Sequence, residues 1–158
     1  MAWKNFSIWR GRLPHWRAED VVYYATFRHR RPLTEPERSL LLNTLLRSDG
    51  KYLDVLIACV LPEATEIVFT ARVAPSGETY ELSDILEKAK TKAGRKIIKS
   101  TSERFPPFYN ESYDRIIRDE IELEERWSAI FDSPIAHELV EDVEEYPYLW
   151  VADAPTSV

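Results

Sequence analysis

The 158-residue sequence has little cysteine and little glycine, and each shortage excludes a class of function. The single cysteine, Cys59, excludes an intramolecular disulfide and a thiolate metal cluster. The four glycines form neither a GxGxxG nor a GxxxxGK(S/T) motif, which excludes the common phosphate-binding loops. No apolar run approaches the roughly 18 residues of a membrane span, and the N-terminus has no apolar leader segment. We therefore expect a cytoplasmic protein without a membrane partner.

What is present suits one globular domain, taken as residues 1–158, of which 44% of the residues are hydrophobic and 30% are charged. The net charge of −6 is unevenly distributed. Residues 1–31 carry seven Lys or Arg against two acids, and residues 86–104 repeat that balance. Residues 119–158 carry one Arg against twelve acids, which gives −11. The basic segments predict a cationic patch.

Hydrophobic patterning predicts strands and helices in alternation. Strands are expected over residues 21–30, 52–61, 65–73 and 112–118, and helices over 34–49, 81–100, 119–131 and, after an interruption at Pro134, 134–143. Thr34 is the expected N-cap of the first helix. The order predicts an α+β fold in which helices cover an antiparallel sheet mainly on one face.

An ordered set of short motifs resembles one protein family. The motifs are RLPHW (12–16), YYATFR (23–28), CVLPE (59–63) and ESYDRIIRDEIEL (111–123), followed by Tyr146 and Trp150. In order and spacing the chain resembles the REP-associated tyrosine transposases, relatives of the IS200-type single-tyrosine transposases in the HUH endonuclease superfamily. The resemblance spans about residues 12–150 and implies a ferredoxin-like sheet.

The resemblance also implies that the catalytic residues are missing. In that family a His-x-His pair after the Leu-Pro break binds a divalent metal at the scissile phosphate, and a tyrosine on a later helix attacks phosphorus. On this chain the histidine positions are Ala64 and Glu66, the tyrosine position is Ala129, and a nearby Asn position is Ser133. The three histidines, His15, His29 and His137, form no His-x-His pair. We expect no catalysis, no metal and no cofactor.

Alternatives to complete inactivity remain open. Glu66 alone could hold Mg²⁺ weakly through its carboxylate. A residual metal-dependent nuclease for single-stranded DNA would need relocated residues. Of the other tyrosines, Tyr113 is expected to pack on the predicted sheet, and Tyr109 lies in a proline-rich connector without a neighbour that would activate it.

Nucleic-acid binding uses other residues than cleavage, and cations that could neutralise phosphates remain. The candidates are Arg12, His15, Arg17, Arg28, Arg30, Arg31, Lys88, Lys92, Arg95, Lys96 and Lys99, with His29 inside the second group. Trp16 could stack on unpaired bases or anchor the N-terminal arm. Arg115 and Arg118 could join this set or pair with the acidic helix.

We predict an inactive transposase-like protein that binds a hairpin or single-stranded DNA. The alternative is a protein-interaction module that uses the acidic residues 119–145.

Overall fold

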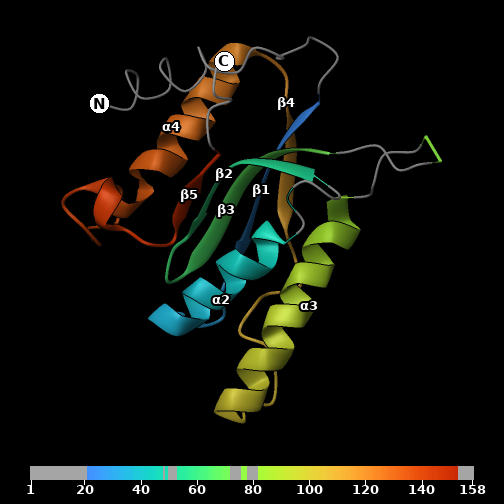
Figure 1. Ribbon diagram of the computed structural model, residues 1–158, viewed down its shortest axis with the longest axis vertical. Coiled ribbons are helices and arrows are strands. Elements are labelled where there is room, and N and C mark those ends of the chain that lie inside the picture. The colour runs from blue at the N-terminus through green and yellow to red at the C-terminus, as the bar shows by residue number, and fades with distance from the viewer. Residues whose placement is uncertain (1–20, 48, 50–52, 72–75, 78–81, 153–158) are drawn as a thin grey trace, which may run out of the picture.

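Figure 1 shows the computed structural model, which describes residues 21–47, 49, 53–71, 76–77 and 82–152. The elements are β1 (Val22–Arg28), α2 (Glu35–Leu46), β2 (Leu53–Val60), β3 (Ala64–Ala71), α3 (Leu82–Thr101), β4 (Tyr113–Ile117), α4 (Glu120–Ala136), the short 3-10 helix η1 (Val143–Glu145) and β5 (Leu149–Val151). The candidate residues Arg12, His15, Trp16 and Arg17 lie outside the described residues. None of the helices described is long and apolar enough to cross a membrane.

The strands form one antiparallel sheet in the order β4-β1-β3-β2-β5. The first six elements follow the strand–helix–strand–strand–helix–strand order of ferredoxin-like folds, and β5 extends the sheet beside β2. The predicted α+β class and antiparallel sheet are confirmed. β2 lies inside the sheet, because it pairs with β3 on one side and with β5 on the other.

Helices cover both faces of the sheet. Successive side chains of a strand point to opposite faces, so β3 sends Phe69 to one cluster and Val68 to another. The first cluster packs against α2 and α3, and the second against Trp127 and Ile130 of α4. Figure 1 shows α4 on the opposite side of the sheet from α2 and α3. Two of the three described α-helices, α2 and α3, thus share one face, as the prediction of helices mainly on one face requires, and α4 covers the other face because the strands are apolar on both sides.

The start of α2 is fixed by local hydrogen bonds. The Thr34 side chain accepts from the Glu37 backbone N–H at 3.4 Å, and the Glu37 carboxylate accepts from the Thr34 N–H at 2.9 Å. This reciprocal pair satisfies two backbone donors that a helix start otherwise leaves without partners. Thr34 is therefore the N-cap, as its sequence position predicts.

The C-terminal quarter differs from the sequence-based expectation. α4 does not stop before Pro134 but runs to Ala136, because a proline in the last turn removes only the N–H that would have bonded to the Ile130 carbonyl. The helix expected over 134–143 is wrong. The chain turns at Glu138, where φ is 58°, and continues through η1 into β5. The Tyr146 hydroxyl donates to the Val60 carbonyl at 2.6 Å, which secures this return to the sheet.

Candidate nucleic-acid interface

Two of the positions that the resemblance assigns to the site, Glu66 on β3 and Ser133 on α4, are neighbours in the structure. Ala64 and Glu66 occupy alternate positions of β3 and share a face of the sheet. The Ser133 hydroxyl of α4 donates to the Ala129 carbonyl at 2.8 Å and lies 3.4 Å from Oε1 of Glu66. β3 and the end of α4, which the motif resemblance assigns to one site although they are distant in sequence, are therefore neighbours in space.

The Glu66 carboxylate is engaged by a buried tyrosine. The Tyr24 hydroxyl donates to Oε2 of Glu66 at 3.2 Å, and the Arg126 guanidinium lies 4.6 Å from the centre of the Tyr24 ring. Burial, together with the charge and hydrogen bond of Glu66, raises the pKa of Tyr24 to about 12. Tyr24 therefore stays protonated at neutral pH, so it acts as a hydrogen-bond donor to Glu66. Burial likewise raises the pKa of Cys59, opposite Glu66 on β2, which keeps it a thiol.

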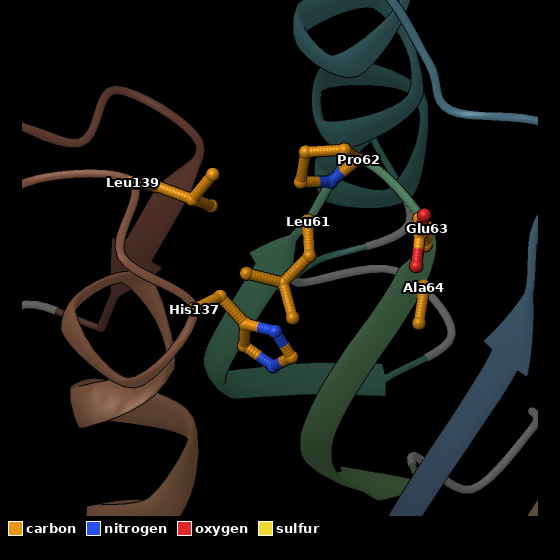
Figure 2. Close-up of a pocket in the computed structure, with 6 residues that line it drawn as sticks. All are labelled: Leu61, Pro62, Glu63, Ala64, His137 and Leu139. Atoms are coloured by element: carbon orange, nitrogen blue, oxygen red, sulfur yellow. The ribbon is translucent and has the colours of Figure 1, made fainter.

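A pocket of about 280 Å³ lies beside Ala64, at the turn between β2 and β3. It is lined by Leu61, Pro62, Glu63, Ala64, His137 and Leu139. Figure 2 shows the His137 ring next to Leu61, with Glu63 and Ala64 on the other side of the turn. The lining supplies one imidazole and one carboxylate. Throughout the part of the chain that the structure describes, no three His, Cys, Asp or Glu side chains gather where a metal ion could be held.

The basic sequence RHRR at the end of β1 divides into outward and inward side chains. Arg28 and Arg30 are exposed, whereas His29 is buried. His29 Nδ1 lies 2.8 Å from the Pro62 carbonyl and Nε2 lies 2.8 Å from the Thr65 hydroxyl. A carbonyl only accepts, so Nδ1 carries the proton and Nε2 accepts from Thr65. Burial lowers the pKa of His29 to about 4, so it is a neutral structural residue at neutral pH and not a cation for phosphates.

Arg31 is held by two carboxylates. Its Nη1 and Nη2 donate to Glu37 at 2.8 and 2.7 Å, and its Nε and Nη2 donate to Glu103. Nη1 also donates to the Pro32 carbonyl at 3.0 Å. These bonds use all five N–H groups of the guanidinium, which leaves none for a phosphate in this structure. The hydrogen bonds from Arg31 lower the pKa of Glu37 to about 2. Arg31 thus joins the end of β1 to α2 and to the segment after α3.

The predicted cations of α3 form one exposed stripe. Lys88, Lys92, Arg95, Lys96 and Lys99 are all exposed. Their spacing confines them to an arc of about 100° around the helix axis. The buried residues Ala89, Ala93 and Ile97 lie on the core side. We call these five cations the α3 basic stripe.

Motif analysis missed Lys90, Arg104 and Phe105. Lys90 is buried, donates to the Asn110 carbonyl at 3.2 Å, and has a pKa lowered by burial. Arg104 and Phe105 belong to the exposed connector after α3. The available signal was the run RFPPFY (104–109), in which an arginine and aromatic residues flank two prolines.

One of the two arginines for which the sequence left two roles open forms an ion pair with the acidic helix α4. Arg115 Nε on β4 donates to the Glu122 carboxylate, so Arg115 pairs with the acidic helix. Tyr113 makes an edge contact with the Tyr24 ring at 6.4 Å between centres but is 54% exposed, so it packs on the sheet only in part.

Comparisons with known proteins place the fold. No protein-family model matches the chain, and no curated protein matches it in sequence. Among solved structures it is similar to a REP-associated tyrosine transposase bound to a REP hairpin, with a TM-score of 0.61 and 13% sequence identity. The match covers 90% of this chain and 93% of the other. At this identity the likeness establishes the fold, so the chain has the architecture of that transposase.

Proposed function

We propose that this chain is a transposase-like protein that binds structured or single-stranded nucleic acid and does not cleave it. The observation that carries the proposal is a fold shared over nine-tenths of both chains with a transposase whose structure was solved on a REP hairpin. The motif resemblance assigns Ala64, Glu66 and Ala129 to the positions of the metal ligands and the nucleophile.

Binding is supported by cations that project into solvent. The α3 basic stripe supplies five, and Arg28 and Arg30 supply two more at the end of β1. Each cation that neutralises a phosphate releases a counterion, which makes affinity fall steeply with salt. Arg31 and His29 are left out of the proposed interface because both are bonded within the protein.

The absence of cleavage is supported by side-chain chemistry at the corresponding positions. The methyl groups of Ala64 and Ala129 can neither bind a metal nor attack phosphorus. Glu66 accepts a hydrogen bond from Tyr24, so its carboxylate is committed on at least one oxygen. A lone carboxylate of this kind is a poor substitute for two imidazoles.

Fluorescence anisotropy with a labelled hairpin and a labelled single strand tests the binding. We expect micromolar or tighter affinity that falls about a thousandfold or more between roughly 50 and 200 mM salt if most of these cations contact phosphates. Changing Lys92, Arg95 and Lys96 together to Glu should abolish it. Arg95→Glu alone should weaken binding several-fold, whereas the matched control Arg47→Glu, an exposed arginine at the end of α2, should leave it within about twofold. No binding even at low salt would overturn the proposal and favour a protein partner for residues 119–145.

Incubation of the same hairpin with the protein and Mg²⁺ or Mn²⁺ tests the second half of the proposal. We expect intact strands and no covalent protein–DNA adduct on a denaturing gel. Metal-dependent nicking that persists after further purification, and disappears in Glu66→Ala, would instead establish a residual nuclease.

A further inference from the structure

The connector of residues 102–110, here called the strap, is fixed to the body of the protein. The Arg30 N–H donates to the Pro107 carbonyl at 2.7 Å, and the Tyr109 N–H donates to the Arg28 carbonyl at 3.1 Å. Near the far end, Lys90 donates to the Asn110 carbonyl at 3.2 Å. These bonds join the strap to the end of β1 and to α3.

Close packing against α3 fixes the strap further. A Cβ added to Gly94 would lie 3.0 Å from Cβ of Pro106, so the strap packs closely against the helix at a position where a larger residue would have to displace Pro106 by a few tenths of an ångström. Phe108 is buried, and its ring meets Phe27 edge-on at 5.8 Å between centres. The strap is therefore a rigid part of the fold that already contributes one aromatic ring to the core.

Two other aromatic rings of the strap remain outside. Phe105 is 59% exposed and Tyr109 is 44% exposed. A guanidinium lies over one face of each ring: the central carbon of Arg104 is 5.5 Å from the centre of Phe105, and that of Arg30 is 5.3 Å from the centre of Tyr109. A rigid segment thus presents two flat apolar surfaces to solvent, each accompanied by a planar cation.

This pairing matches the chemistry of a nucleotide that is not base-paired. An exposed ring offers a face on which a base can stack, and a neighbouring guanidinium can bond to the phosphate. The strap has one carboxylate, Glu103, and Arg31 binds it. Arg31 is also bonded to Glu37, so these three side chains together carry one negative charge. Arg30 and Arg104 add two positive charges, and the remaining positive charge favours a polyanion such as a nucleic acid.

We propose that the strap is a subsite for the unpaired bases of a single strand, with Phe105 and Tyr109 as stacking platforms and Arg104 and Arg30 as phosphate contacts. The inference rests on the proposed nucleic-acid binding and adds where a single strand is recognised. Gly94 follows Lys92 by two residues and so lies on nearly the opposite side of α3. The strap and the α3 basic stripe therefore contact separate parts of a nucleic acid.

The test uses the full chain and three probes: a single-stranded DNA carrying 2-aminopurine, an RNA of the same sequence, and a blunt DNA duplex. Stacking on a ring quenches 2-aminopurine fluorescence. The double variant Phe105→Leu, Tyr109→Leu keeps apolar bulk and removes the flat rings. We expect it to lose the quenching and to bind single strands about 10- to 100-fold more weakly, with duplex affinity within about twofold of the unchanged protein.

Tyr113→Leu is the matched control, because Tyr113 is a 54% exposed tyrosine on β4 outside the strap. It should keep both affinity and quenching. If the double variant loses affinity for only one of the two single strands, DNA or RNA, that strand is the one that the subsite binds. Undiminished single-strand affinity and quenching in the double variant would overturn this inference while the proposed function stands. Failure of the unchanged protein to bind any probe would overturn both.

Discussion

The polar cluster under α4 and the basic cluster at the end of β1 differ in what their side chains face. Under α4, Tyr24 and Ser133 both approach the Glu66 carboxylate in the space between helix and sheet. At the end of β1, Arg28 and Arg30 are exposed, although Nε of Arg30 donates to the Phe108 carbonyl, whereas the polar atoms of His29 and Arg31 are bonded within the protein. The difference teaches that a polar residue is available to a ligand only where its neighbours leave its donors unused. The α4 cluster stabilises the fold, whereas half of the β1 cluster can still bind.

The largest expected effect comes from a substitution that disrupts the packing of α4 on the sheet. Ile130→Ala removes a side chain that is 0% exposed and packs between α4 and the sheet, so the free energy of unfolding should fall by about 3 kcal/mol. Ile121→Ala, on the same helix but 68% exposed, should change it by less than about 0.5 kcal/mol. Urea unfolding measures both. Equal losses would mean that α4 does not pack on the sheet through its inner side.

The free energy of unfolding measured across a pH series tests whether His29, at the end of β1, is buried and neutral. Its pKa is about 4 in the folded protein and 6.5 in the unfolded chain, so the unfolded chain takes up the proton first as pH falls. The free energy of unfolding should therefore decrease between pH 6.5 and 4, by about 2–3 kcal/mol. Thermal unfolding of His29→Gln should lack this slope, whatever its absolute stability. His137→Gln, at an exposed histidine, should retain it.

Arg31→Met removes the ion pairs that Arg31 forms with Glu37 and Glu103. It leaves the buried Glu37 carboxylate without its cation, and because Arg31 is partly exposed we expect a loss of about 1–2 kcal/mol at neutral pH. Glu37 has a pKa of about 2 when folded and 4.5 when unfolded, so its stabilisation is present above pH 4.5 and is lost as pH falls toward 2. The variant should lose less stability across that window.

The exposed Arg28 provides the contrast. Arg28→Met should leave unfolding nearly unchanged and weaken nucleic-acid binding, and Arg31→Met should do the reverse. If both variants weakened binding equally at a pH and temperature where both are folded, the division of this cluster would be wrong.

The smallest expected effect concerns the hydrogen bond under α4. Tyr24→Phe removes the donor to Glu66 and should lower the free energy of unfolding by about 1 kcal/mol. A double-mutant cycle with Glu66→Ala isolates the pair, because alanine leaves no acceptor for the Tyr24 hydroxyl and the coupling energy vanishes if the two side chains do not interact. A coupling energy of zero would mean that the hydrogen bond between Tyr24 and Glu66 does not stabilise the protein.

The inner strands and the helices α2 and α3 could be predicted because their signals are local. Alternation or continuous apolar runs mark β1, β2 and β3, and Thr34 marks the start of α2 by its type alone. β5 has only three residues, too few for a periodic pattern, and exists because Leu149–Val151 pair with β2. Pro134 predicts a break in the sequence, but α4 continues to Ala136, because local rules do not tell how close a helix already is to its end.

The site was harder to predict because its contacts are distant in sequence. The partners of His29 and Arg31 include Thr65 and Glu103, which lie 36 and 72 residues away. Residues 28–31 therefore look uniformly polar in sequence, although Arg28 and Arg30 are exposed, Arg31 is only partly exposed and His29 is buried. The contact between Glu66 and Ser133, 67 residues apart, was accessible only through alignment to family motifs.

The strand order also determines when the sheet can be completed during translation. The three inner strands β1, β3 and β2 all come from residues 22–71, whereas the edge strands β4 and β5 come from residues 113–151. While the intervening residues emerge from the ribosome, β1 and β2 each have one side without a partner, and such open edges invite pairing with other chains. A nascent chain that pauses between these two segments would therefore be more prone to aggregate than the finished protein.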